Sequence, residues 1–265
     1  MRAVAIALLC AICMAVLCAG WIAPFGYEEQ LREDVNGRPS SRHLLGTDTL
    51  GRDRFSRLLY GGRISILAAP AAALVAVALA LTSGLLAACL GGWWERAFGM
   101  ACDLCLSLPW LFLLLAVRGM LPLNVTPAAS VAVTFALLGL LGWAGPSRIL
   151  LAAAKRHLAS DFVLNARCTG CPPWRIAIVQ VLPNLFPIAA AQFLVATPAF
   201  LLAEANLSLL GLGVSEPTPS WGNLLRELDD FSRVSRQPWV VAPLVALAAV
   251  VSCFHLAMPG EEAEQ

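Results

Sequence analysis

The stretch ISILAAPAAALVAVALALTSGLLAACLGGWW runs from Ile64 to Trp94 and contains no charged side chain. About 20 apolar residues are enough for a helix to cross the roughly 30 Å hydrocarbon core of a bilayer. A segment of this length and composition predicts a membrane-spanning helix. The rest of the chain decides whether this helix is a single anchor or one of several.

Other parts of the chain repeat this pattern. A shorter apolar stretch lies between Asp103 and Arg118 and contains Pro109, which neighbouring helices can tolerate within a membrane. We predict it to be a kinked third span, with its two charged ends at the interfaces. Only 13% of the residues are charged, against roughly 25% in soluble domains. The sequence therefore predicts an all-α, multi-pass membrane protein with about six transmembrane helices. The other uncharged runs are Ala3–Tyr27, Gly119–Ser147, Ile176–Ala203 and Gln237–Gly260.

The charged residues divide the chain into segments. The first apolar run continues to Ile22 and Ala23, so we interpret it as an uncleaved helix rather than a signal peptide. From Phe55 to Ile66, apolar and arginine residues alternate as in a short interfacial helix. The predicted segments are an N-terminal transmembrane helix (1–27), an extramembrane segment with this interfacial helix (28–63), a five-helix core (64–260) containing an extramembrane loop (148–175), and an acidic tail (261–265).

Charge gives partial information about topology and partners. The net charge of +1 gives no indication of a nucleic-acid partner. The loop at 148–175 has several basic residues and one acid, Asp161, which favours the cytoplasm. The total of Lys and Arg over all loops slightly favours the opposite orientation, so charge alone leaves the topology open.

Cysteine spacing raises the alternative of a chemical site. Cys102 and Cys105 form one C-x-x-C pair, and Cys168 and Cys171 form another. This spacing occurs in thiol redox sites and in half zinc sites. No histidine or further cysteine nearby in the sequence completes a tetrahedral site, so we predict no metal site.

Residues 161–184 contain the helix-ending and helix-starting residues that are typical of a helix–turn–helix. Gly170 follows a predicted helix that begins at Asp161, and glycine readily supplies a left-handed helix end. Pro172 and Pro173 suit the start of the next helix. Such an element can dock into a groove on another protein. A plain connecting loop is the alternative interpretation.

This stretch resembles the EAA loop of binding-protein-dependent ABC importers. The pattern of that loop is Glu-Ala-Ala, three residues, Gly, nine residues, an Ile-type residue, one residue, then Leu-Pro. The residues that match it are Ala166, Gly170, Leu182 and Pro183, whereas Leu164, Asn165 and Gln180 stand where the pattern has Glu, Ala and Ile. The resemblance implies that the cysteines are small fillers in a loop that docks an ATPase. The docking residues it implies are Asp161, Ala166, Gly170, Arg175, Leu182 and Pro183.

Two further stretches extend the resemblance. HLLGTDTLGRDRFSRLLYGGRISI, residues 43–66, and AEANLSLLGLGVSEPTPSWGN, residues 203–223, are similar to the C-type permease subunit of dipeptide, oligopeptide and nickel importers. The resemblance covers about residues 43–240. It implies a type I ABC importer permease fold with both termini cytoplasmic in a bacterial inner (plasma) membrane. It also implies a homologous second permease, two ABC ATPase subunits, a periplasmic substrate-binding protein and surrounding membrane lipid as partners.

The chain lacks the residues of an ATPase. A Walker A loop needs a lysine after a glycine-rich turn. The only lysine, Lys155, lies in LLAAAKRH with no glycine ahead of it. We therefore predict a transport subunit rather than an enzyme, with no cofactor of its own. The resemblance implies that ATP and Mg are bound by partner ATPases.

Polar residues near the end of the fifth predicted span are candidates for the translocation path. Glu204, Asn206 and Ser208 lie on this segment, and an ionisable residue at that depth indicates function. Trp221 and Asn223 lie in the following loop and are candidates for contact with the binding protein. The alternatives to an importer subunit are a nucleotide-independent secondary transporter or channel, and a membrane thiol oxidoreductase. Nothing in the sequence selects the transported solute.

Overall fold

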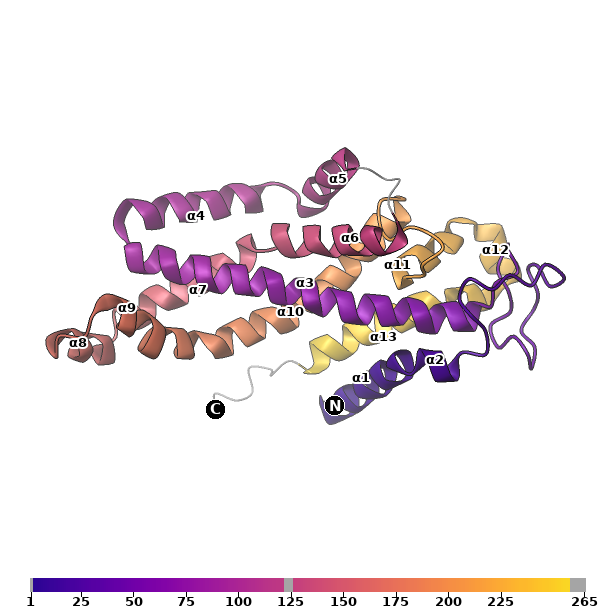
Figure 1. Cartoon of the computed structure of the whole chain (residues 1–265), viewed down its shortest axis with the longest axis horizontal. Coiled ribbons are helices and arrows are strands. Elements are labelled where there is room, and N and C mark those ends of the chain that lie inside the picture. Colours follow the sequence, from indigo (N-terminus) through magenta and orange to yellow (C-terminus); the bar gives the residue numbers. More distant parts are fainter. Residues whose placement is uncertain (1, 122–125, 258–265) are drawn as a thin grey trace.

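The chain folds into an elongated bundle of helices (Figure 1). The computed structural model describes residues 2–121 and 126–257; the predicted acidic tail, 261–265, and the last residues of the predicted core lie outside this range. Apart from an isolated bridge between Thr47 and Asp53, the regular structure of the described residues is helical. The helices are α1 (Arg2–Leu17), α2 (Ala19–Ile22), α3 (Arg54–Leu90), α4 (Gly92–Ser107), α5 (Trp110–Met120), α6 (Pro127–Leu141), α7 (Ala144–Leu158), α8 (Asp161–Cys168), α9 (Pro173–Arg175), the π-helix η1 (Ile176–Val181), α10 (Leu182–Leu209), α11 (Trp221–Leu224), the 3-10 helix η2 (Leu225–Asp229), α12 (Phe231–Arg236), the 3-10 helix η3 (Pro238–Val241) and α13 (Ala242–Ala257).

The apolar helices confirm an all-α membrane protein. Within the described residues, four helical runs are long and apolar enough to cross a membrane, and the bent pair α4–α5 gives a fifth. The remaining predicted span corresponds to α1, a shorter apolar helix of 16 residues. All six predicted segments are therefore helical. The four long runs are Arg54–Leu90, Pro127–Leu158, Pro173–Leu209 and Pro238–Ala257.

Helix α3 joins two elements that the sequence predicts separately. The predicted interfacial helix at 55–66 is helical, but it continues without a break into the following span. Asp53 starts the helix, because its carboxylate accepts a hydrogen bond from the Ser56 backbone N–H at 2.7 Å. No helix-ending residue follows until Gly91, whose φ is +62°. With 37 residues, α3 is about 55 Å long, well beyond the hydrocarbon thickness of a bilayer.

The third span is longer and more sharply broken than the prediction of Asp103–Arg118. It begins at Gly92 in α4 and ends at Met120 in α5, and the two helix axes differ by 86°. The break falls at Leu108 and Pro109 because proline clashes with the preceding turn and has no N–H for it. Asp103 does not mark the end of the span. It forms an ion pair with Arg148 of α7 at 3.3 Å.

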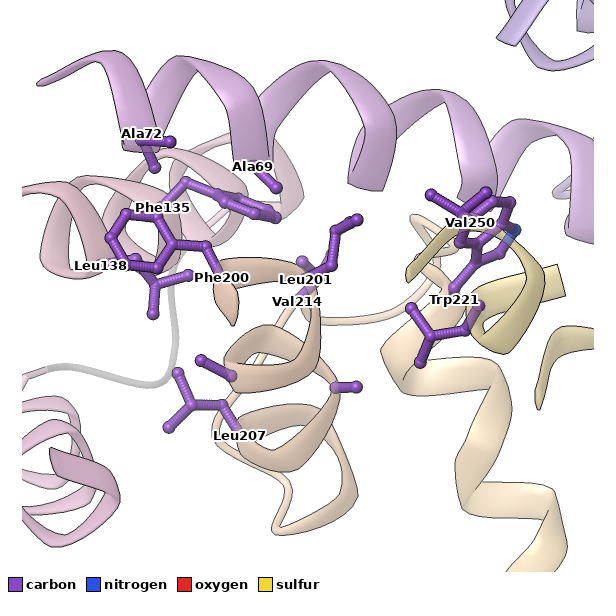
Figure 2. Close-up of a cluster of buried hydrophobic side chains, with 14 of the residues drawn as sticks. Ala69, Ala72, Phe135, Leu138, Phe200, Leu201, Leu207, Val214, Trp221 and Val250 are labelled. Carbon is purple, nitrogen blue, oxygen red and sulfur yellow. The ribbon is translucent and has the colours of Figure 1, made fainter. Parts of the chain in front are cut away.

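Small residues let the helices approach closely. Of three glycines spaced three residues apart near the α6–α7 junction, Gly139 and Gly142 are closely packed, whereas Gly145 faces open space. A Cβ at Gly139 would lie 3.0 Å from the Ala72 carbonyl oxygen of α3. The central cluster is built by α3, α6, α10, α11 and α13 (Figure 2). Its labelled side chains are Ala69, Ala72, Phe135, Leu138, Phe200, Leu201, Leu207, Val214, Trp221 and Val250.

Candidate functional site

The α8–α9 element projects from one end of the bundle, where the sequence predicts a helix–turn–helix (Figure 1). Gly170 has φ +76° just after the end of α8. Its N–H donates to the Arg167 carbonyl oxygen, and the Cys171 N–H donates to the Ala166 carbonyl oxygen, both at 3.0 Å. These two bonds form a Schellman motif, which needs the left-handed conformation that glycine adopts most easily. The predicted end of the first helix and the predicted start of the second are confirmed to within a residue.

One side of α8 is attached to the bundle and the other is free. Val163 and Ala166 are buried and pack in a cluster with Ile176 and Val181 of η1. Asp161 lies at the first position of α8 and is exposed, as are Arg167 and Arg175. Several large apolar side chains are exposed beside these charges. They are Phe162, Leu164, Trp174, Ile178 and Val179.

A π-helix connects this element to the fifth span. The Leu182 N–H donates to the Ala177 carbonyl oxygen, five residues back. Pro183 explains the irregularity, because it has no N–H to continue the α-helical pattern. Leu182 is partly buried and Pro183 is exposed. The helix continues through Leu182 and Pro183, because Pro173–Leu209 is one continuous helical run.

The cysteines of the second C-x-x-C pair, Cys168 and Cys171, are bonded neither to each other nor to another cysteine of the described residues. Cys168 is exposed and Cys171 is partly buried, and both are free thiols. The described residues contain no group of three or more metal-ligating side chains suited to a metal ion. The structure thus gives no support to the zinc interpretation.

At the far end of α10, a buried carboxylate organises the following loop. Glu204 is 1% exposed, and its Oε1 accepts hydrogen bonds from the Ser208 and Ser220 hydroxyls, each at 2.7 Å. Gly222 packs directly on this carboxylate, since a Cβ there would lie 2.7 Å from Oε1. Removing the partner of a buried hydrogen-bonding group costs about 1–3 kcal/mol. Glu204 therefore attaches the 210–224 loop to the end of the span.

Two candidates for contact with a binding protein are not on the surface. Trp221 is 1% exposed, with its indole N–H donating to the Leu58 carbonyl oxygen at 3.0 Å. Asn223 is 7% exposed and forms a capping box with Ser220. The prediction that these side chains are accessible is wrong, because α11 turns them into the core. Sequence alone predicts that polar and aromatic residues in a loop are exposed, because it does not show the residues that pack on them.

The three polar candidates on α10 separate onto two faces. Glu204 and Ser208 are four residues apart and share the buried face. Asn206 lies between them and is exposed. Of the three, only Asn206 remains available to a solute or to another chain in this structure.

An arginine network that the sequence analysis did not single out forms a cap at the same end. Arg52 and Arg57 both bind the Glu216 carboxylate, with N–O distances of 2.7 and 2.8 Å. Arg52 also binds Asp48 at 2.7 Å. Burial disfavours the Arg52 charge, but its hydrogen bonds and ion pairs with Asp48 and Glu216 raise its pKa overall. Through Glu216, these pairs join the end of the 28–53 segment and the first turn of α3 to the 210–236 segment. The close spacing of Arg52, Arg54 and Arg57 in the sequence was the feature that could have predicted these ion pairs.

The two groups of polar elements thus lie at opposite ends of a bundle of membrane-spanning helices (Figure 1). One end presents a capped helix with an exposed face, and the other has a closed polar cap. This arrangement is that of a multi-pass membrane protein with a structured polar element at each end of its bundle.

Comparison with known proteins identifies the family. The model for "binding-protein-dependent transport system inner membrane component" matches residues 76–258, and the chain belongs to this family. The chain is 32% identical to the di/tripeptide transport system permease protein DppC of Pseudomonas aeruginosa over 260 residues, covering 94% of this chain and 82% of that protein. It is 31% identical to the glutathione transport system permease protein GsiD of Shigella flexneri over 237 residues, covering 89% and 74%.

The family assignment confirms several predictions. The chain is a multi-pass inner-membrane permease subunit of a binding-protein-dependent ABC importer, and it is a transport subunit rather than an enzyme. The family implies partner subunits, including a binding protein. The roles of individual residues in the two ends remain predictions.

Proposed function

We propose that this chain pairs with a homologous permease to form the transmembrane part of an importer for short peptides. Two ABC ATPases would dock on the α8–α9 elements, and a periplasmic binding protein would deliver the peptide at the opposite end. ATP and Mg would be bound by the ATPases. The single observation that carries this proposal is the Schellman-capped helix α8, held rigidly on the bundle with an apolar and basic face exposed.

The docking face combines a fixed base with exposed contacts. Ala166 is buried against the bundle, so its part is to hold α8 in place rather than to touch a partner. Trp174 is 65% exposed, and Arg175 is exposed next to it. Exposed aromatic and arginine side chains are the types enriched at binding hot spots. We therefore assign Trp174 and Arg175 as the principal contacts of the docking face, with Gly170, Leu182 and Pro183 setting its geometry and the exposed Asp161 at its start.

Two of the three departures from the EAA pattern line the same surface hollow. Asn165 and Gln180, which stand in place of Ala and Ile, both line a surface hollow of about 380 Å³ together with Arg175. Within the described residues, the Gln180 Oε1 is buried and has no hydrogen-bond partner. A partner that donates a hydrogen bond into this hollow would offset the missing glutamate. Such a contact supports a working, rather than an inactive, docking loop.

Coupling between the two ends would use the continuous helical run Pro173–Leu209. Movement of α9 would be transmitted through η1 and α10 to Glu204 and Ser208, and from there to the 210–224 loop. ATP binding drives transport only if it favours one conformation over another. Asn206, exposed on α10, is our candidate for the translocation path, whereas Glu204, Ser208, Trp221 and Asn223 form its structural support.

Short peptides are the solute class best supported by the relatives. One relative is named as a di/tripeptide permease, and the other as a permease for glutathione, which is itself a modified tripeptide. Nickel complexes and longer peptides, which the resemblance to the wider subfamily includes, have no counterpart among these two.

The test is a pull-down of the tagged chain from native membranes in mild detergent, with partners identified by mass spectrometry. The wild-type chain should recover a second permease and Walker-containing ATPases. Trp174→Ala should lose the ATPases and keep the second permease. Trp21→Ala is the matched control, because Trp21 is 91% exposed on α2, away from the docking face. Recovery of the chain alone, with uptake after reconstitution without ATP, would refute the proposal and favour a secondary transporter.

A further inference from the structure

The break in the third span borders a partly open cavity between the α4–α5 pair and helices α7 and α10. Its volume is about 520 Å³, and its walls come from α4, α5, α7, α10 and the α6–α7 junction. Trp110 stacks on Phe200, with ring centroids 6.0 Å apart, and forms one wall. Gly145 forms part of another wall, and a Cβ added there would meet nothing within 4 Å. The volume lies in the range of small-molecule sites, roughly 300–1,000 Å³.

The lining is apolar but contains unpaired polar groups. The residues that line the cavity, in the part of the chain that the structure describes, carry no charge. Gln192 of α10 is its polar side chain, and within the described residues its amide has no hydrogen-bond partner. Gln192 is partly buried, so its amide is accessible from the cavity and can donate and accept hydrogen bonds with a bound molecule.

Two helix ends add backbone groups to the same lining. Cys105 and Leu106 belong to the last turn of α4, where carbonyl oxygens have no donor within the helix. Pro146 removes the N–H that would otherwise pair with the Gly142 carbonyl oxygen. Both breaks thus leave acceptors without helical partners on residues that line one cavity. Broken helices supply solute-binding groups in this way in membrane transporters.

We propose that this cavity is a binding site for the transported solute, and that it takes the uncharged backbone and small apolar side chains of a short peptide. The peptide N–H groups pair with the free carbonyls and with Gln192, and the apolar walls surround the side chains. The charged peptide termini remain outside, because the cavity has no counter-charge and burying an unpaired charge is costly. The assignment rests on the proposed peptide-import function.

The first test fills the cavity. Gly145→Leu adds a side chain into open space at the wall, and Gly119→Leu adds the same side chain at another helical glycine with open space, at the end of α5 outside the cavity. Each variant is reconstituted as the complete importer in liposomes with binding protein, ATP and radiolabelled trialanine. Gly145→Leu should lower uptake about tenfold, which corresponds to 1.4 kcal/mol. Binding-protein-stimulated ATP hydrolysis should persist, and Gly119→Leu should transport normally.

The second test uses a native thiol as a probe of occupancy. Cys105 lines the cavity and is partly buried, whereas Cys168 is exposed on α8. The complete importer is treated with N-ethylmaleimide, and labelled cysteines are located by mass spectrometry. Trialanine should slow the labelling of Cys105 and leave that of Cys168 unchanged. Gln192→Leu should weaken this protection.

The outcomes distinguish failure of the cavity site from failure of the proposed peptide-import function. ATP-driven trialanine uptake by the wild type, unchanged in Gly145→Leu and with Cys105 unprotected, overturns the cavity site and leaves the import function standing. The same result is expected if a lipid acyl chain fills the cavity. Absence of ATP-driven trialanine uptake by the wild type overturns the peptide function, and the cavity assignment falls with it.

Discussion

Replacement of Gly170 by valine tests whether the Schellman motif orders the docking helix. Gly170 has φ +76°, and an added Cβ would meet nothing within 4 Å, so the cost of the side chain lies in the backbone alone. The left-handed conformation costs an L-residue about 1–2 kcal/mol, and a β-branched side chain is among the least suited to it. The chain can relieve this cost by giving up the two hydrogen bonds that end α8.

Loss of these two hydrogen bonds increases the population of molecules in which the end of α8 is unwound. A change of 1–2 kcal/mol alters an equilibrium by a factor of about 5–30. Hydrogen exchange at the Gly170 region should therefore accelerate by about that factor, with the Cys171 amide reporting directly because it donates in the motif. Binding-protein-stimulated ATP hydrolysis should fall in parallel, because the docking face loses its fixed orientation.

Gly170→Asn is the matched control, since asparagine tolerates the left-handed region. It should exchange slowly and remain coupled. If Gly170→Val also exchanges as slowly as the wild type, or exchanges rapidly while ATP hydrolysis stays fully coupled, the reasoning that links the cap to docking is refuted.

Three further predictions concern packing and capping. Glu204→Ala leaves the Ser208 and Ser220 hydroxyls without their acceptor and should destabilise the detergent-solubilised protein by about 2–4 kcal/mol in thermal unfolding; an unchanged midpoint would contradict the assigned role. Gly139→Leu should cost about 1–3 kcal/mol or more by forcing α6 away from α3, and retention of wild-type stability would show that the helices can separate freely. Asp230 caps α12, and hydrogen bonds from the Ser232 side chain and nearby backbone N–H groups lower its pKa. Its stabilisation of α12 is present above the ordinary carboxyl pKa and lost as pH falls through the lowered one. The hydrogen-exchange protection factors of α12, which are corrected for the intrinsic pH dependence of exchange, should therefore fall in acid in the wild type but not in Asp230→Asn.

The sequence predicted where individual helices start and end. The end of α8 at Gly170 and the start of α9 at Pro173 follow from backbone preferences that neighbours do not override. The apolar runs predicted the helices of the bundle because hydrocarbon leaves helices as the stable form for such segments. Within the described residues, these two signals account for most of the fold and for the α8–α9 element.

Tertiary placement was less accessible. Trp221 was predicted to contact a binding protein because its loop is rich in proline and polar residues, yet Gly62 leaves space for its indole ring against α3. The cap depends on Glu216 meeting Arg52 and Arg57, which are more than 150 residues away along the chain. No periodic pattern encodes such a meeting. The cavity at the α4–α5 break likewise follows from an angle that Pro109 permits but does not specify.

Helix α3 has a mechanical consequence. Its first turn carries Arg54 and Arg57, which bind acidic residues of the cap, and its body packs along α6, α7 and α10. Its last turn ends where the chain turns into α4. A displacement of the cap therefore moves one continuous helix, α3, that extends along the whole bundle. Its one interior proline is Pro70. Tilting this helix by a few degrees displaces its two ends in opposite directions, so the cap cannot shift without moving the side that faces the docking helix.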